Sequence, residues 1–378
     1  MSLTRLLLKK VMTKQKVFLN TSEIAAYINQ NKYDFVTPFE RIWKKIDFVD
    51  YTKALNQLNE NMLNNQVMIN KLSNEKELLE LELNDKKITK RQYNKLLKEL
   101  TQKEENVKIE LNNISIKIDK VKLTQSEQVE KALGSDIIKK INSTSVDTDE
   151  KRSITNKVIE DLKLSDDMKK ELFKKTENVI NKTHGTIKED SAIKMFEDKF
   201  NVKLDISQTY NKMFLKEISQ NSKYDWYIGG KVDGLYIDNN NNENSYVVEV
   251  KSRVKGFFNS LRDYEKTQIQ LYIHMLNLNN AKLIEKYNNK IRVTEIQKDS
   301  QYIDDILTYL EIFVKNFENY FLGNYESKVS YLNSSDEQKK HFIKNMYLDD
   351  IAKKESELYE LRMINNASNE DCLVDDLD

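Results

Sequence analysis

The chain has 378 residues, enough for two domains or for one domain that carries a large insertion. Its 61 basic and 61 acidic side chains give a formal net charge of zero, which excludes a uniformly basic nucleic-acid binder. A single cysteine, Cys372, excludes an internal disulfide framework, and no stretch holds the roughly 20 apolar residues of a membrane-spanning helix. We therefore expect a soluble, intracellular protein.

Two segments near the N-terminus contain residues that typically begin helices. Thr21 and Ser22 open one, and Thr37 with Pro38 opens another. A hydroxyl at a helix N-terminus is also well placed to contact a phosphate, because the first backbone N–H groups have no partner within the helix. By itself, Ser22 reads as a plain helix cap.

Residues 52 to about 130 have a seven-residue apolar repeat, which is typical of a coiled coil. The repeat positions of the two runs are Leu55, Leu58, Met62, Ile69, Leu72, Leu79 and Leu83, then Tyr93, Leu97, Leu100, Val107, Leu111, Ile114, Ile118 and Val121. Residues 84–88 break the pattern, and Thr89 with Gln92 forms a capping box that begins a new helix. The sequence predicts an antiparallel helical hairpin roughly 50 Å long.

The rest of the chain changes character near Gly185. Residues 134–181 read as short helices, with Thr148 and Ser165 as caps. Beyond them we expect helices and strands to be mixed: helices over 189–200, 260–276 and 303–321, and strands from Tyr224, over 246–251, and near Lys282 and Ile291. This order predicts an α/β fold in which helices flank a mixed sheet.

A hairpin in this region brings acidic side chains together. Asp233 and Glu249 are each eight residues from Asn241, so a hairpin centred on Asn241 makes them face one another. Glu249 and Lys251 point to one face of their strand, and the valines beside Glu249 point to an apolar layer on the other. The alternative is a solvated strand face, because an acid and a lysine recur by chance on charged strands.

Two carboxylates and a lysine at one point suit Mg²⁺ or Mn²⁺, hard cations that take carboxylate oxygens and keep several waters. In phosphodiester hydrolysis, paired metals lower the pKa of the attacking water and stabilise the leaving oxygen. Lys251 would orient that water and offset the developing negative charge.

Two helices supply further candidates. Glu189 lies in line with the apolar stripe of its helix, where a carboxylate needs a partner, although Thr186 and Glu189 also fit a capping box. Gln268 and Tyr272 are four residues apart and share a helix face, with a core aromatic as the alternative for Tyr272.

Together these motifs resemble the PD-(D/E)XK nucleases. The Gln-x-x-x-Tyr spacing is similar to the RecB-like branch, and the order of motifs is similar to YqaJ-type viral recombinases and the lambda exonuclease group, with a core also similar to Cas4-like nucleases. The resemblance covers roughly residues 21–46 and 185–306 and leaves out the helical arm. With one cysteine, a four-cysteine iron–sulfur site is excluded.

The resemblance implies a nuclease that hydrolyses double-stranded DNA with two metals, as an exonuclease, with additional endonuclease activity left open. It implies catalytic roles for Asp233, Glu249, Lys251, Glu189, Gln268 and Tyr272, and metal ligands at Asp233, Glu249, Val250 and Glu189. In the lambda exonuclease group the serine region lies near the DNA phosphates, so the resemblance also implies a DNA contact at Ser22. Arg253 and Lys255 extend a basic track that is a candidate for phosphate contacts.

We expect residues 1–50 and 182–325 to form the nuclease domain, 51–181 to form a helical insertion, and 326–378 to form a helical segment with an acidic tail. The coiled-coil arm favours a homo-oligomer. A different class of protein remains open at this stage: a coiled-coil scaffold whose nuclease-like domain only binds DNA or a partner.

Overall fold

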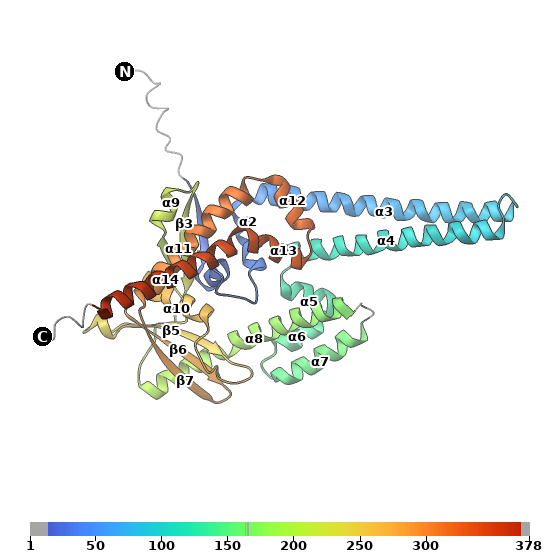
Figure 1. The fold of residues 1–378 in the computed structure, drawn as a ribbon. Coiled ribbons are helices and arrows are strands. Elements are labelled where there is room, and N and C mark those ends of the chain that lie inside the picture. The colour runs from blue at the N-terminus through green and yellow to red at the C-terminus, as the bar shows by residue number, and fades with distance from the viewer. Residues whose placement is uncertain (1–13, 163, 165, 372–378) are drawn as a thin grey trace, which may run out of the picture. The chain divides into compact units, whose positions relative to one another are not determined.

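The computed structural model describes residues 14–162, 164 and 166–371 and has a mixed α/β fold (Figure 1). It divides into two compact units. Unit 1 holds the described residues up to 48, residues 185–327 and those from 334 onward; unit 2 holds residues 49–184 and 328–333. Within the described residues, no helix is long and apolar enough to cross a membrane. Cys372 and Ser165 lie outside the described residues.

Unit 1 contains two sheets. Sheet A has the order β1 (Gln15–Asn20), β3 (Tyr224–Lys231), β2 (Tyr210–Phe214), with β1 parallel and β2 antiparallel to β3. Sheet B has the order β4 (Gly234–Tyr236), β5 (Tyr246–Ser252), β6 (Asn280–Tyr287), β7 (Lys290–Gln297), in which only β5 and β6 are parallel. The chain leaves sheet A and enters sheet B within two residues, Val232 and Asp233.

Helices cover both faces of sheet B. On one face, Ile269 and Ile273 of α10 (Asp263–Met275) pack with Val247 of β5. On the other, Phe196 of α8 (Asp166–Phe200) packs with Val248 and Val250. The valines beside Glu249 therefore point into an apolar layer, as the alternation along the strand predicts.

An aromatic core fills the rest of unit 1. It lies between α2 (Val36–Ile46), α11 (Ser300–Asn316), the π-helix η5 (Phe317–Leu322) and the π-helix η6 (Lys344–Leu348). Rings in contact here include Phe39 with Phe321, Trp43 with Phe321, and Phe313 with Tyr347. The short helices η3 (Thr21–Glu23), α1 (Ile24–Tyr27) and α9 (Lys216–Gln220), with α13 (Asp336–Ile343) and α14 (Asp349–Asp371), complete the unit.

Unit 2 contains the predicted helical hairpin, formed by α3 (Phe48–Asn84) and α4 (Lys90–Lys122), which lie side by side in Figure 1. Leu58, Leu72 and Leu79 are buried, and the other described repeat positions are at least partly buried. Lys76 on α3 occupies the repeat position between Ile69 and Leu83. It forms an ion pair with Glu104 on α4 at 2.5 Å, so this polar side chain has a partner on the facing helix. The Thr89 capping box forms, with Gln92 N donating to Thr89 Oγ1 at 3.3 Å. The coiled-coil prediction is confirmed.

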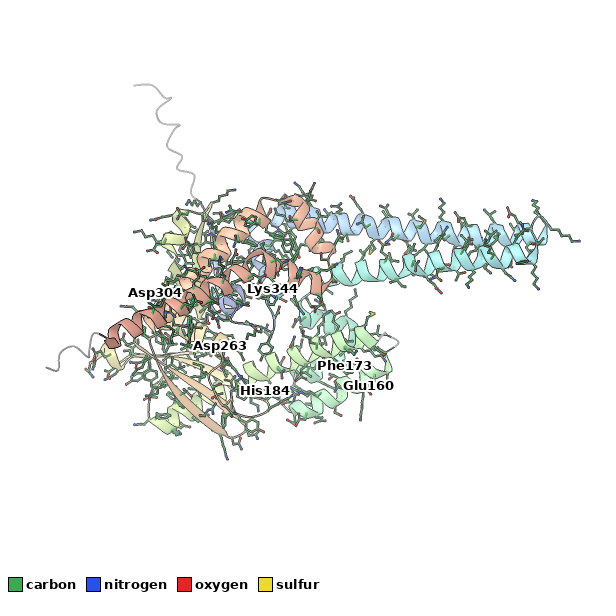
Figure 2. All side chains as sticks on the ribbon, viewed as in Figure 1. Glu160, Phe173, His184, Asp263, Asp304 and Lys344 are labelled. Atoms are coloured by element: carbon green, nitrogen blue, oxygen red, sulfur yellow. The ribbon has the colours of Figure 1, made fainter. Side chains whose placement is uncertain are left out.

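The remainder of unit 2 is a small helical bundle of α5 (Gln125–Leu133), α6 (Ser135–Asn142), α7 (Thr148–Asp161) and the first part of α8. Val129, Ile141 and Ile159 form its core, and Phe173, labelled in Figure 2, packs against them. Most of α12 (Tyr325–Asn333) also belongs to unit 2, where its Lys328 forms an ion pair with Asp50 of α3 at 2.8 Å.

Three details of the predicted elements were wrong. No helix begins at Thr186, because α8 continues through Gly185 from Asp166. Thr148 is the first residue of α7 and its cap is Asp147, whose carboxylate accepts from Thr148 N at 2.6 Å. Strands β1 and β2 were not predicted.

Candidate active site

The hairpin of β4 and β5 has the register that the sequence predicts. Gly234 pairs with Val248 and Tyr236 with Tyr246, so extending this register by one residue places Asp233 opposite Glu249. The Asp233 carboxylate reaches across the hairpin, where its Oδ2 accepts from Val250 N at 2.7 Å. The two strands thus place two acids at the point where the chain crosses between sheets.

Glu249 and Lys251 form a buried ion pair. Lys251 Nζ donates to Glu249 Oε1 at 2.5 Å and lies 3.4 Å from Gln268 Oε1 on α10. Glu249 is only 2% exposed, and its second oxygen, Oε2, has no hydrogen-bond partner among the described residues. An unpartnered buried carboxylate oxygen is costly, so a positively charged partner at Glu249 Oε2 would stabilise this site.

Burial and mutual repulsion shift the acids away from their ordinary behaviour. Burial raises the pKa of Glu249 to about 7, with Lys251 opposing the shift and Asp233 adding to it. Burial also raises the pKa of Asp233 to about 6. Burial acts against the charged form of Lys251, but Glu249 and Asp233 outweigh it and raise the lysine pKa. The protonation states of these three side chains are therefore coupled.

Tyr272 lies on α10, close to these three side chains. This helix begins at Asp263, which is labelled in Figure 2. The Tyr272 hydroxyl donates to Lys231 O at 2.7 Å, which fixes the end of β3 just before Asp233. Gly230 allows this approach, because a Cβ there would lie 2.8 Å from both the Tyr272 hydroxyl and Thr21 Oγ1. Thr21 is 1% exposed, and its hydroxyl has no partner among the described residues.

Glu189, on α8, interacts electrostatically with Glu249 and Lys251. Burial raises its pKa, with a further contribution from the negative charge of Glu249. Gln208 Nε2 donates to Glu189 Oε1 at 3.2 Å. The structure thus brings six of the predicted residues together: Asp233, Glu249, Lys251, Gln268 and Tyr272 directly, and Glu189 through its charge.

The donor set fits a hard divalent cation in its chemistry. Its acids are carboxylates, two of them have strongly raised pKa values, and Glu249 Oε2 is buried and unpartnered. Among the described residues, however, no three His, Cys, Asp or Glu side chains are close enough to form a ready ligand group. Asp233 contacts Val250 N and Glu249 contacts Lys251 instead.

The three residues predicted to contact DNA, Arg253, Lys255 and Ser22, differ in their exposure. Arg253 is 8% exposed and forms hydrogen bonds to Glu265 at 2.7 Å and Glu285 at 2.8 Å, so it is a buried structural residue and not part of an accessible basic track. Lys255 is exposed in the loop after β5. Ser22 is exposed within η3, where Asn20, the residue before this short helix, makes no side-chain cap.

The sequence reasoning missed Thr21 and Gln208. Thr21 directly follows β1, and β1 has no clear signal of its own because half its residues are polar. The sequence showed Thr21 only as a polar residue before a helix. Such residues are too common for the sequence to mark Thr21 as part of a site.

No protein-family model matches this chain, and no curated protein matches its sequence. Among solved structures, a crystal structure of SSO0001 is similar over 51% of this chain and 88% of the other, with 16% identity and a TM-score of 0.29. A structure of LHK-Exo in complex with dAMP is similar over 55% of this chain and 89% of the other, with 12% identity and a TM-score of 0.25. Because both TM-scores are low, we assign neither fold family nor function from these similarities.

Proposed function

We propose that this protein is a metal-dependent DNA nuclease with a PD-(D/E)XK-type core, whose site is formed by Asp233, Glu249 and Lys251. One observation carries the proposal: Glu249 Oε2 is buried without a partner among the described residues, beside a second, partly buried acid and a lysine. A scaffold has no need for this costly arrangement, whereas a cation site does.

Asp233, Glu249 and Glu189 would hold Mg²⁺ or Mn²⁺, with the main chain of Val250 as a further ligand. The bound metals would activate the attacking water and neutralise charge on the phosphate. Lys251 supplies a fixed positive charge for the developing phosphate oxyanion. Gln268 positions the lysine ammonium, and Tyr272 fixes the end of β3. We expect double-stranded DNA as substrate and exonuclease activity.

The proposal is tested with Asp233→Asn and Lys251→Ala. Asp233→Asn removes a charged ligand, so it should weaken Mn²⁺ binding in calorimetry and abolish cleavage. Lys251→Ala keeps the acids, so the metal should still bind while the cleavage rate falls about 10²-fold or more. Cleavage is measured on end-labelled linear and circular duplexes, with an RNA duplex in parallel.

Asp198→Asn on α8 and Lys290→Ala on β7 are matched controls, because both side chains are exposed. They should cleave at the wild-type rate. Wild-type cleavage by Asp233→Asn or by Lys251→Ala would contradict the site assignment and favour the scaffold alternative.

A further inference from the structure

Sheet A has one buried and one open face. Successive side chains of a strand point to opposite faces. On the buried face, Leu19 of β1 and Trp226 and Ile228 of β3 are 0% exposed. On the other face, Phe214 of β2 is 44% exposed and Tyr210 is 46% exposed. Large exposed aromatic side chains on an open sheet face often mark a binding surface.

The aromatic side chains on this open face form a continuous row. Phe18, Tyr227 and Phe214 are paired across the three strands by the sheet register. The ring centroids of Phe18 and Tyr227 are 5.0 Å apart with an interplanar angle of 20°, and those of Phe214 and Tyr227 are also 5.0 Å apart, at 41°. Tyr210 adds a fourth ring, which lies over Gly229 in the space where a Cβ would be. We call Phe18, Tyr210, Phe214 and Tyr227 the aromatic face.

Positive charge surrounds the aromatic face. Lys16, Lys212 and Lys231 lie on the same side of sheet A by the alternation of their strands, and all three are exposed. The acid that shares this side is Asp225, opposite Lys16. Within the part of the chain that the structure describes, none of the three lysines forms a salt bridge. Aromatic rings among free lysines are complementary to a polyanion with exposed rings of its own.

Strand β3, which carries Tyr227 of the aromatic face, ends two residues before Asp233 of the candidate active site. Lys231 ends β3, and its carbonyl accepts the Tyr272 hydroxyl at 2.7 Å. Asp233 follows Lys231 by two residues.

We propose that the aromatic face binds the unpaired bases at a single-stranded end of the duplex substrate and directs the backbone of that strand to the carboxylates of the candidate active site. This inference rests on the proposed nuclease function and names its substrate more closely. Unpaired bases can stack on Phe214 and Tyr210 whatever their sequence, while the lysines contact phosphates. A duplex keeps its bases stacked inside, so it cannot use these rings.

The test measures binding of a fluorescent oligo-dT of about 12 nucleotides, a length within the usual range for such sites. The full chain carrying Asp233→Asn is used without divalent metal, so that the DNA is not cleaved. Adding Phe214→Ala or Tyr210→Ala should weaken single-strand binding by about 5-fold to 150-fold, the range reported by alanine substitution of a stacking aromatic. Affinity for a blunt duplex of the same length should change less than about twofold.

Controls separate stacking from folding and from charge. Tyr320→Ala removes a tyrosine that is 63% exposed elsewhere in unit 1 and should leave single-strand binding unchanged. Phe214→Leu keeps an apolar side chain but removes the ring, so it should weaken binding even if Phe214→Ala fails to fold. Lys212→Glu with Lys231→Glu should reduce the salt dependence of binding, and Lys290→Glu should not.

The outcomes distinguish this inference from the proposed function. If the wild type cleaves DNA but Phe214→Leu and Tyr210→Ala bind single strands as tightly as their parent, the aromatic face is not the strand-binding site and the nuclease proposal stands. If no cleavage occurs but these variants lose single-strand binding, the face binds DNA and the nuclease proposal fails. Equal losses for single strand and duplex, or a changed subunit number, would overturn the stacking inference.

Discussion

Among single residues, Asp233 links stability to pH. Its pKa is raised by burial from 3.8 to about 6. A raised carboxyl pKa means that the folded state holds its proton more tightly than the unfolded state, so the contribution of Asp233 to stability is greatest below about pH 4 and falls as the pH rises through about 6.

We therefore expect Asp233→Asn to be more stable than the wild type at pH 8 without divalent metal. Its amide oxygen can still accept from Val250 N, and the buried charge is gone. The melting temperature should rise by at least about 2–4 °C, the shift for 1 kcal/mol in a domain of this size. The difference should shrink below pH 6 and vanish near pH 4. A variant less stable than the wild type at pH 8 would show that the charged form is already well compensated.

Gly230 gives a second prediction at this scale. A methyl group there would lie 2.8 Å from both Thr21 Oγ1 and the Tyr272 hydroxyl, so Gly230→Ala should destabilise the protein by about 1–3 kcal/mol and reduce cleavage. Gly323→Ala is the matched control, because the nearest atom to its added Cβ lies at 3.7 Å. Urea unfolding measures both variants. Equal stability of the two would mean that Tyr272 and Thr21 can move aside.

At the scale of secondary-structure elements, Arg253 joins the end of β5 to its neighbours. Its guanidinium forms hydrogen bonds to Glu265 on α10 and Glu285 on β6, which are 1% and 2% exposed. It also lies 4.0 Å from the ring centre of Phe258. These contacts fix the strand that carries Glu249 and Lys251.

Arg253→Ala should therefore lower the free energy of unfolding by about 3–5 kcal/mol, because it removes the cation that pairs with buried Glu265 and leaves Glu285 with Arg292 alone. Lys255→Ala, in the exposed loop nearby, should change it by less than about 0.5 kcal/mol. Urea denaturation compares the two. A DNA-contact role for Arg253 predicts the reverse pattern, with weaker DNA binding and unchanged stability.

Elements with a local signal were predictable from sequence. The heptads and the Thr89 capping box repeat over a few residues, and the register that pairs Asp233 with Glu249 follows from the centre of one hairpin. Strand β1 was missed because its partner β3 lies about 200 residues later. The burial of Arg253 could not be predicted locally either, because its partners lie on two other elements, α10 and β6.

At the scale of the whole molecule, the outer face of the arm formed by α3 and α4 is a candidate surface for self-association. The heptad seam is already covered by pairing of α3 with α4. A second set of apolar side chains on α3 lies on one face away from that seam: Leu63, Val67, Leu78 and Leu81 are 64%, 60%, 60% and 58% exposed. We expect this stripe to mediate self-association.

Val67→Lys with Leu78→Glu should lower the subunit number measured by light scattering, while leaving the helical content unchanged. Replacing Glu80 and Glu82 of the same helix by Gln is the control, because both are exposed and polar. An unchanged mass for the stripe variant would count against an assembly role for the arm.

The parallel pairing of β1 with β3 also sets the order in which this protein can fold during synthesis. Gln15 pairs with Tyr224, so β1 leaves the ribosome long before its partner exists. At 5–20 residues per second, it waits about 10–40 s. The arm needs only neighbouring contacts and can form within that interval. The candidate active site depends on β3 and β5, so it is completed late, and a nascent chain does not contain the assembled site until most of its length has emerged.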